Sequence, residues 1–208
     1  MLNSPICYFT MDNVFTNEEC QKIIHLAKTT GKNTAGKIGG NETDYGMPFQ
    51  ETIHVDEEVR KTELFFFSEQ WVYDKIMPHI AHINRESRWN FSLSKFEALQ
   101  LGIYTTGGHY DWHVDENPYP YDNKAGPFEG LVRKLSFSIL LNDKDYTGGD
   151  FEIEDQLPGH SPRSTVVDEL NNLGSMIVFP SFTPHKVHPV TSGVRYSLVG
   201  WICGEPWR

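Results

Sequence analysis

The chain has 208 residues and a formal net charge of −10 at pH 7, with 38% apolar and 22% charged residues. A chain of this length and composition can bury a sizeable core, and we expect one globular domain over residues 1–208. Sequence-independent binding to nucleic acid needs clustered Lys and Arg, so the acidic balance excludes nucleic acid as a partner. Nothing in the composition indicates an oligomeric state.

The cellular location is predicted from what the sequence lacks. No run of about 18 apolar residues occurs, and the start, MLNSPICYFT, has no basic region followed by a long apolar one. Cys7, Cys20 and Cys203 are odd in number and lack a C-x-x-C spacing, which indicates reduced thiols and no disulfide framework. We therefore expect a cytoplasmic protein without a membrane partner.

Two helices are predicted in the first 90 residues. The first begins at Thr16 or Asn17, which are favourable N-cap residues, and is closed by Gly31. The second spans about 68–85 and should be kinked or interrupted at Pro78. Their apolar stripes predict the buried faces, which comprise Ile23, Ile24, Leu26 and Ala27 in the first helix and Trp71, Ile76, Ile80 and Ile83 in the second.

The remaining segments are predicted as short strands and connections. A glycine-rich run at 31–50 is predicted as a loop, and a first strand is expected at 51–55 or 61–67. Later strands are expected at 96–104, 110–114, 134–142, 149–153, 175–180, 185–189 and 195–203, with irregular connections at 115–130 and 155–174. Many short strands with long connections are typical of an antiparallel sandwich or barrel of the jelly-roll kind. The sequence thus predicts a mainly β fold, with helical support in 1–90 and a jelly-roll core in 91–208.

The first candidate for chemistry is the pair His113 and Asp115, at the predicted end of a strand. Side chains at i and i+2 of a strand point to the same face, so the imidazole and the carboxylate could bind neighbouring positions on one metal ion. Alone this signal is weak, because His-x-Asp is frequent by chance. Non-haem Fe(II) oxygenases hold their metal with two His and one carboxylate, so a second His is required.

Three histidines after Asp115 are candidates for that ligand, namely His160, His185 and His188. His160 lies in a run rich in Gly and Pro, whereas His185 follows the end of a strand, and strand parity does not separate His185 from His188. Arg195 opens the next apolar strand, and in a meander it would stand one strand away from the metal. Its planar guanidinium could pair with one carboxylate of a dicarboxylic keto acid whose other end chelates the metal.

Several spaced elements occur in order after residue 96. They are Y-x-x-G-G-x-Y-x-x-H-x-D from Tyr104 to Asp115, R-x-x-S-x-x-x-x-L-N from Arg133 to Asn142, a Gly-Gly turn at 148–149, H-x-V-x-P from His185 to Pro189, and the later Arg195 and Trp201. Together they resemble the 2-oxoglutarate and Fe(II)-dependent dioxygenases, in particular the prolyl 4-hydroxylase-like branch. The resemblance covers residues 96–203, and it implies a double-stranded β-helix fold.

The resemblance also implies cofactors and their ligands. Fe(II) would be held by His113, Asp115 and His185, with 2-oxoglutarate and O2 as co-substrates, succinate and CO2 as products, and ascorbate as a further candidate cofactor. Leu140 stands where some relatives have a tyrosine that reaches the carboxylate of 2-oxoglutarate. In this chain that contact would therefore come from Arg195 together with Tyr104.

The resemblance favours a peptidyl prolyl residue as the substrate to be hydroxylated. Tyr110, Arg133 and Trp201 are the candidate substrate-binding residues, and the loops at 31–50 and 115–130 could fold over an extended peptide. Free proline or another small metabolite is the alternative substrate. A non-catalytic metal-binding jelly-roll module and a zinc or manganese enzyme with a cupin-like barrel are alternatives of other classes.

Overall fold

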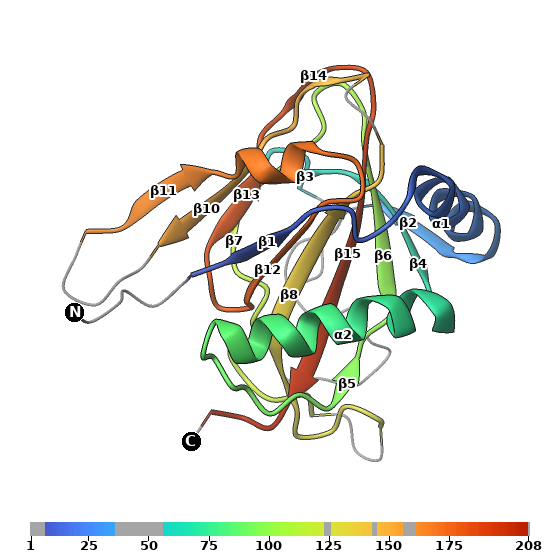
Figure 1. Ribbon diagram of the computed structural model, residues 1–208. Coiled ribbons are helices and arrows are strands. Elements are labelled where there is room, and N and C mark those ends of the chain that lie inside the picture. Colours follow the sequence, from blue (N-terminus) through green and yellow to red (C-terminus); the bar gives the residue numbers. More distant parts are fainter. Residues whose placement is uncertain (1–6, 36–55, 123–125, 143–144, 156–160, 208) are drawn as a thin grey trace.

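The computed structural model describes residues 7–35, 56–122, 126–142, 145–155 and 161–207 (Figure 1). Two α-helices and a short 3-10 helix accompany the strands in this part of the chain. They are α1 (Asn17–Thr30), α2 (Gln70–Glu86) and η1 (Asp168–Asn171).

The strands form two larger antiparallel sheets and one small ribbon. The major sheet contains, in spatial order, β1 (Phe9–Met11), β12 (Met176–Pro180), β8 (Val132–Leu140), β15 (Arg195–Gly204), β6 (Leu99–Tyr104), β4 (Glu63–Phe67) and β2 (Lys32–Ala35), with β5 (Lys95–Phe96) paired to β15. The minor sheet contains β11 (Arg163–Val166), β10 (Phe151–Asp155), β13 (His185–Val187), β7 (His109–His113) and β3 (Arg60–Lys61). The ribbon pairs β14 (Val190–Ser192) with β9 (Thr147–Gly148).

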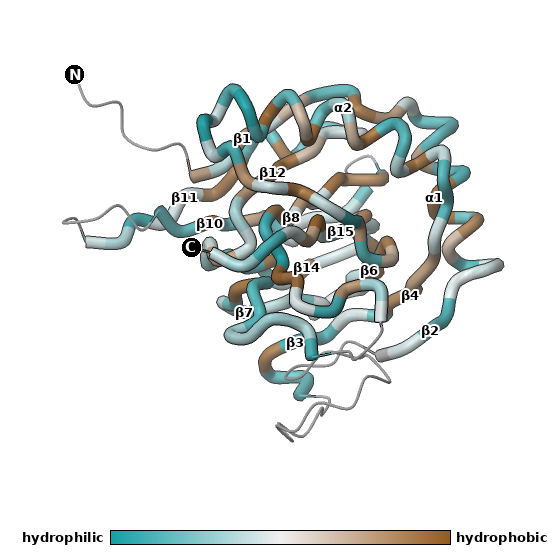
Figure 2. Tube along the Cα trace, turned by 90° about the horizontal axis from the view of Figure 1, so that it is seen from below, coloured by the Kyte–Doolittle hydropathy of each residue, from teal (hydrophilic) through white to brown (hydrophobic). Residues whose placement is uncertain are grey.

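The helices and the two sheets form successive layers, which are seen from the side in Figure 2. Both helices lie on the outer face of the major sheet, and one apolar cluster joins them to that face. Along β8 the residues alternate, because Leu135, Phe137 and Ile139 belong to this cluster while Leu140 belongs to the cluster between the sheets. The helices therefore bury one face of the major sheet and leave its other face for the minor sheet.

The space between the two sheets combines apolar and polar side chains. Phe151 and Val187 of the minor sheet pack with Phe179 of the major sheet at the apolar part. The inward face of the major sheet also buries polar side chains, which comprise Gln100, Ser136, Ser138, Arg195 and Ser197. Buried polar groups need partners, so this interior is built for a polar function as well as for packing.

The fold class and most of the helix predictions are confirmed. Strands predominate, and the helices support one sheet of a jelly-roll sandwich. Thr16 caps α1 in a reciprocal hydrogen-bonded box with Glu19, and Gly31 follows its last residue. In the stripe of α1, Leu26 is only half-buried.

The predicted interruption of the second helix is wrong. Helix α2 continues through Pro78, which lies on its exposed side, where water can replace the hydrogen bond that proline cannot donate. Val72 is buried at its N-terminal end, whereas Trp71 is half-buried and packs its ring edge-on against Phe15.

Several strand boundaries also need correction. The expected strand 96–104 is two strands, β5 and β6, with a break next to Glu97, whose side chain pairs with Arg133. Strand β7 ends at His113 and not at residue 114. The segments 31–50 and 155–174, predicted as irregular, contain β2 and β11 with η1 respectively, which are edge elements with little periodicity of their own. Of the two candidate first strands, 51–55 lies outside the described residues and 61–67 contains β4.

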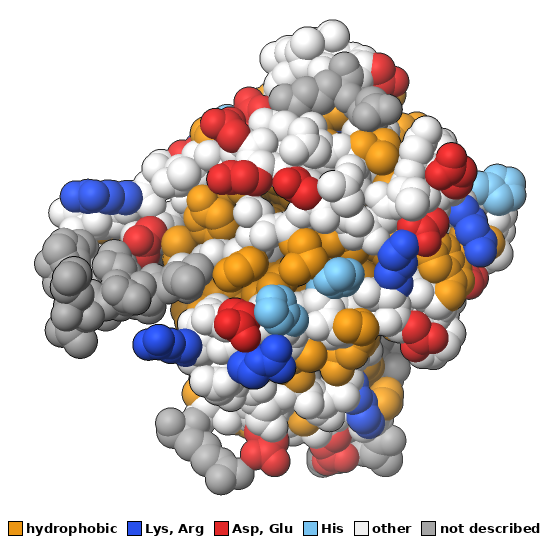
Figure 3. Space-filling view, viewed as in Figure 1, with side chains coloured by type: hydrophobic (Ala, Val, Ile, Leu, Met, Phe, Trp, Pro, Cys, Tyr) orange, Lys and Arg blue, Asp and Glu red, His pale blue; other side chains and the backbone are white. Residues whose placement is uncertain are grey.

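The surface gives no sign of a basic binding face in the view of Figure 3. Among the described residues on this face, Lys and Arg side chains are scattered between acidic ones and form no continuous patch. In the described part of the chain, no helix is long and apolar enough to cross a membrane.

The contact between Gly200 of β15 and the fully buried Phe137 of β8 yields a stability prediction. A Cβ at position 200 would stand 2.7 Å from Cε1 of Phe137, closer than such atoms approach. Gly200→Ala should therefore lower the free energy of unfolding by about 1–3 kcal/mol, measured by urea denaturation. In a protein that already carries Phe137→Leu, Gly200→Ala should cost less stability than it does in the native protein, because the smaller side chain leaves room for the Cβ. If the two losses simply add in the double variant, this packing is contradicted.

Candidate metal centre

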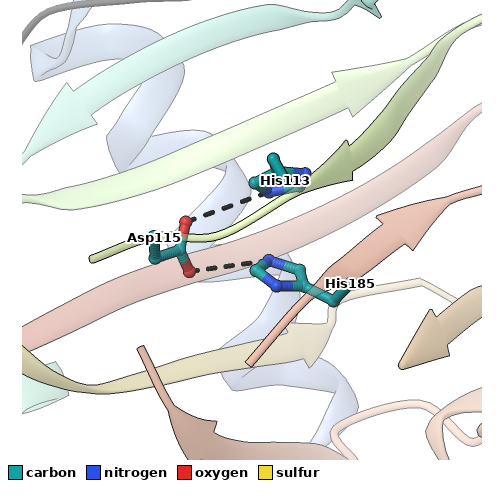
Figure 4. Close-up of side chains that lie close together, drawn as sticks. All are labelled: His113, Asp115 and His185. Atoms are coloured by element: carbon teal, nitrogen blue, oxygen red, sulfur yellow. Dashed lines mark ion pairs between the residues drawn. The ribbon is translucent and has the colours of Figure 1, made fainter. Parts of the chain in front are cut away.

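Three side chains that could bind a metal ion meet between the sheets (Figure 4). His113 ends β7 and His185 begins β13, and the two residues are direct partners in the antiparallel pairing of these strands. Asp115 follows two residues after His113. Its Oδ1 lies 3.9 Å from Nε2 of His113, and its Oδ2 lies 3.5 Å from Nε2 of His185. Their ligand atoms all lie within 4.8 Å of one another, which is close enough to share one ion.

Backbone carbonyl groups orient both imidazoles. Nδ1 of His113 lies 2.7 Å from the carbonyl oxygen of Asp111, and Nδ1 of His185 lies 3.0 Å from that of Thr183. A carbonyl oxygen only accepts, so each Nδ1 carries the proton and each Nε2 of the neutral ring presents its lone pair. Both lone pairs then face the carboxylate of Asp115.

Asp115 is held by its backbone and by its side chain. Its N–H donates to the carbonyl oxygen of Ser181 at 2.9 Å, outside the β7 ladder, and its own carbonyl oxygen accepts from Nη1 of Arg133 at 3.2 Å. The hydroxyl of Ser136 is a hydrogen-bond partner of its carboxylate. Since the residue is not in the strand, tertiary hydrogen bonds, and not strand alternation, direct Asp115 towards His113.

The charge states of the cluster suit a divalent metal. Burial, and next to it the neighbouring His185, lower the pKa of His113 well below its ordinary value. Burial alone would raise the pKa of Asp115, but His185, His113 and Arg133 outweigh it and lower that pKa. Two imidazoles and one carboxylate are the donor set that non-haem Fe(II) sites use, so these residues fit the ion that the sequence predicts.

Arg195 lies between the same two sheets, but not where the meander placed it. His185 belongs to the minor sheet and Arg195 to the major sheet, so the two are not on neighbouring strands. Instead Arg195 is the direct partner of Tyr104 across β15 and β6, and its guanidinium carbon lies 5.5 Å from the centre of the Tyr104 ring. The prediction that Arg195 is one strand from the metal is therefore wrong, because β14 and a change of sheet intervene.

The guanidinium of Arg195 has no counter-charge in the part of the chain that the structure describes. The side chain is 2% exposed, its Nη1 has no hydrogen-bond partner, and it forms no ion pair with any described residue. A buried, unpaired charge is costly, so this group fits an anion supplied from outside the chain. Burial raises the pKa of the nearby Tyr146 hydroxyl, while Arg195 acts in the opposite direction. The sequence prediction missed Tyr146, although its position just before the Gly-Gly turn is a usable signal.

Arg133, a predicted substrate-binding residue, is engaged within the protein. Its Nε and Nη2 donate to the two carboxylate oxygens of Glu97, both at 2.7 Å, and the hydroxyl of Tyr121 donates to Glu97 at 2.6 Å. Its guanidinium carbon lies 4.0 Å from the centre of the Trp201 ring. Arg133 and Trp201 thus contact each other, and Arg133 links Glu97 to the backbone of Asp115.

The remaining candidates occupy separate places. The ring of Tyr110 stacks on that of His113 at 3.4 Å, so Tyr110 lies beside the metal ligands. His188 bonds to Glu152 at 2.7 Å and is not part of the cluster. A hydrogen bond from Ser164, with Lys186 and His188, lowers the pKa of Glu152 to about 2. His160 lies outside the described residues.

The sequence matches the model of the 2OG-Fe(II) oxygenase superfamily over residues 99–203. Among curated proteins it is similar to a PKHD-type hydroxylase of Synechococcus sp. (strain CC9605), with 36% identity over 115 residues that cover 54% of this chain and 45% of the relative. It is also similar to a PKHD-type hydroxylase of Hyphomonas neptunium, with 37% identity over 109 residues that cover 52% and 43%. The matched region thus spans less than half the length of these relatives.

Solved structures share the fold at low sequence identity. A viral collagen prolyl hydroxylase of Paramecium Bursaria Chlorella virus-1, in complex with 2OG, has a TM-score of 0.63 and 18% identity, with 96% of this chain and 97% of that chain covered. A prolyl-4-hydroxylase of Pseudomonas putida has a TM-score of 0.62 and 16% identity, with 94% and 92% covered. These likenesses support the double-stranded β-helix fold.

The ligand assignment can be tested by Mn(II) binding. Alanine at His113, Asp115 or His185 should abolish binding in equilibrium dialysis, because the two remaining ligands cannot fix the ion. His188→Ala is the matched control, since His188 is close in sequence but bonds to Glu152. Loss of binding in the control, together with retained binding in His185→Ala, would show that the assignment is wrong.

The buried pair of Glu97 and Arg133 gives a second prediction. Glu97→Gln should lower the free energy of unfolding by about 3–5 kcal/mol, because it leaves the guanidinium buried without its counter-charge. The double variant Glu97→Leu/Arg133→Met removes both charges and should be more stable than Glu97→Gln. Chemical denaturation measures both, and a Glu97→Gln protein as stable as the native chain would refute the structural role of the pair.

Proposed function

The chain belongs to the 2OG-Fe(II) oxygenase superfamily, and from this premise we propose that it is an Fe(II)- and 2-oxoglutarate-dependent hydroxylase. The observation that carries the proposal is one interior that holds both a two-His, one-carboxylate cluster and a buried guanidinium that no described residue neutralises. A metal-binding module without catalysis would not need that second feature, so the pairing favours an enzyme over a binding module.

The proposed metal ligands are Nε2 of His113, the carboxylate of Asp115 and Nε2 of His185. When bound, Fe(II) and 2-oxoglutarate supply the oxidising chemistry with O2, and succinate and CO2 are the products. The residues of this chain hold the donor atoms in one place before the ion arrives. The carbonyl groups of Asp111 and Thr183 keep the imidazoles from turning away.

Arg195 is the proposed partner of the distal carboxylate of 2-oxoglutarate. A guanidinium matches a carboxylate with two parallel hydrogen bonds, and burial shields this pair from water. Tyr104 and Tyr146 flank Arg195, and both are buried. Leu140 faces the same interior opposite Ser197 and offers only packing, which supports Arg195 and the two tyrosines as the polar contacts.

The proposed substrate is a peptidyl prolyl residue, with free proline or another small metabolite as the alternative. This proposal is supported by the similarity in fold to prolyl hydroxylases, one of which, from Trichoplax adhaerens, is in complex with a peptide fragment. Tyr110 and Trp201 are the proposed walls of the substrate site, and Arg133 acts through its contacts to Trp201 and Asp115. The cytoplasmic location, ascorbate as a cofactor and the lid role of the loops stay predictions.

Succinate release tests the proposed reaction. Protein supplied with Fe(II), 2-oxoglutarate and O2 should release succinate slowly alone and faster with a proline-containing peptide or with free proline. Faster release with the peptide would support a peptidyl prolyl substrate, and faster release with free proline would support the alternative. No succinate under any condition, from protein that binds Mn(II), would favour the non-catalytic module.

Arg195→Lys tests the co-substrate site. The lysine keeps the charge but lacks the planar fork, so the 2-oxoglutarate concentration at half-maximal succinate release should rise by about tenfold or more. Mn(II) binding should persist, because Arg195 does not contact the metal ligands. Arg163→Lys, at an exposed position on β11, is the matched control. An unchanged 2-oxoglutarate requirement in Arg195→Lys would place the carboxylate site elsewhere.

A further inference from the structure

A second buried arginine lies close to the metal ligands. Arg60 begins β3, the short strand at the edge of the minor sheet, and it pairs with Tyr110 of β7. The residue is 8% exposed, although an edge strand gives a long polar side chain an easy route to water. A contact within the protein therefore keeps the side chain from extending into water.

That contact is the ring of Tyr110. The His113 ring lies 3.4 Å from the Tyr110 ring and nearly parallel to it, so it covers one face of the phenol. The guanidinium carbon of Arg60 lies 4.2 Å from the centre of the same ring and must cover the other face. Arg60, Tyr110 and His113 thus form a stack, and a single aromatic ring separates the guanidinium from a metal ligand.

In the described part of the chain, the guanidinium of Arg60 is only partly provided with partners. Its Nε is buried without a hydrogen-bond partner, and no carboxylate among the described residues pairs with it. Arg133 is a contrasting case, because Glu97 neutralises its buried guanidinium through two hydrogen bonds of 2.7 Å. Stacking on Tyr110 offsets only part of the cost of burying a charge that has no carboxylate partner.

Among the described residues, Arg195 and Arg60 are thus two buried arginines without a carboxylate partner, and the proposed 2-oxoglutarate site accounts for one. Its distal carboxylate is assigned to Arg195 and its other end to the metal. We propose that Arg60 binds a carboxylate of the primary substrate, which makes the substrate an anion. This inference rests on the proposed function, and it adds the chemical class of the substrate.

The carboxylate could come from two sources. An acidic side chain beside a peptidyl proline provides one, and the free α-carboxylate of an amino acid provides the other. Both present the planar pair of oxygen atoms that fits a guanidinium. The probes of the test are therefore matched pairs that differ only in charge.

The first measurement uses the native protein. Its probes are L-proline against L-prolinamide, and acetyl-Ala-Pro-Glu-Ala-amide against its Gln counterpart. Succinate release at varied probe concentration gives an apparent KM, and dialysis against Mn(II)- and 2-oxoglutarate-loaded protein without O2 gives binding. In one pair the carboxylate probe should be favoured by about tenfold or more, as expected for a charge-assisted hydrogen bond. The pair that responds identifies the source.

The second measurement uses variants of β3. Arg60→Met should remove the preference for the charged probe, and Arg60→Lys should keep part of it. Lys61→Met is the matched control, because it removes a positive charge at the exposed neighbouring position and should keep the preference. Since Met relieves an unpaired buried charge, the unfolding temperature of Arg60→Met should equal or exceed that of the native protein.

Three results would overturn the inference. They are an equal response to both members of each pair, no response to any probe, and a marked fall in the unfolding temperature of Arg60→Met, which would assign Arg60 to structure. Slow 2-oxoglutarate consumption by native protein without any probe shows separately whether the proposed function holds. A failure of the inference is thus distinguishable from a failure of the reaction.

Discussion

The register between β7 and β13 places His185 directly opposite His113, and the rest of the site depends on this pairing. In a strand a slip of one residue turns every side chain to the other face of the sheet. Such a slip would direct Lys186, in place of His185, to the interior and leave the imidazole outside. Val187 of β13, packed between the sheets beside Phe151, helps to fix the register because it would be exposed by the same slip. The metal ligands are therefore placed by core packing.

Buried charge organises the remaining part of the interior. Arg133 is neutralised by Glu97 and ties the loop after Asp115 to the sheet, whereas Arg195 and Arg60 are buried without a counter-charge among the described residues. Buried unpaired charges cost stability, which supports the proposal that Arg195 and Arg60 are retained to bind ligands. On this proposal, the paired Arg133 has a structural role, and the unpaired Arg195 and Arg60 bind the co-substrate and the substrate.

The sequence predicted the parts of this account that depend on local pattern. The capping residue Thr16 and the closing Gly31 define α1 through short-range hydrogen bonds, and the spaced motif from Tyr104 to Asp115 identified two of the clustered ligands. Residues whose role arises from tertiary pairing could not be predicted from the sequence. The apolar neighbours of Glu97 predict an unbroken strand, and the partner of Glu97 lies 36 residues away, so the break could not be foreseen. Arg60 belongs to no sequence motif, and its burial depends on the ring of Tyr110, which is distant in sequence.

The central claim is that one interior binds a metal through His113, Asp115 and His185 and a dicarboxylate through Arg195. A crystal structure of the protein with Mn(II) and 2-oxoglutarate, grown without O2, tests it most directly. The account predicts Mn(II) bonded to Nε2 of both histidines and to the carboxylate of Asp115, with the distal carboxylate of 2-oxoglutarate on the guanidinium of Arg195. Mn(II) bound at His188 and Glu152, or a distal carboxylate away from Arg195, would contradict it.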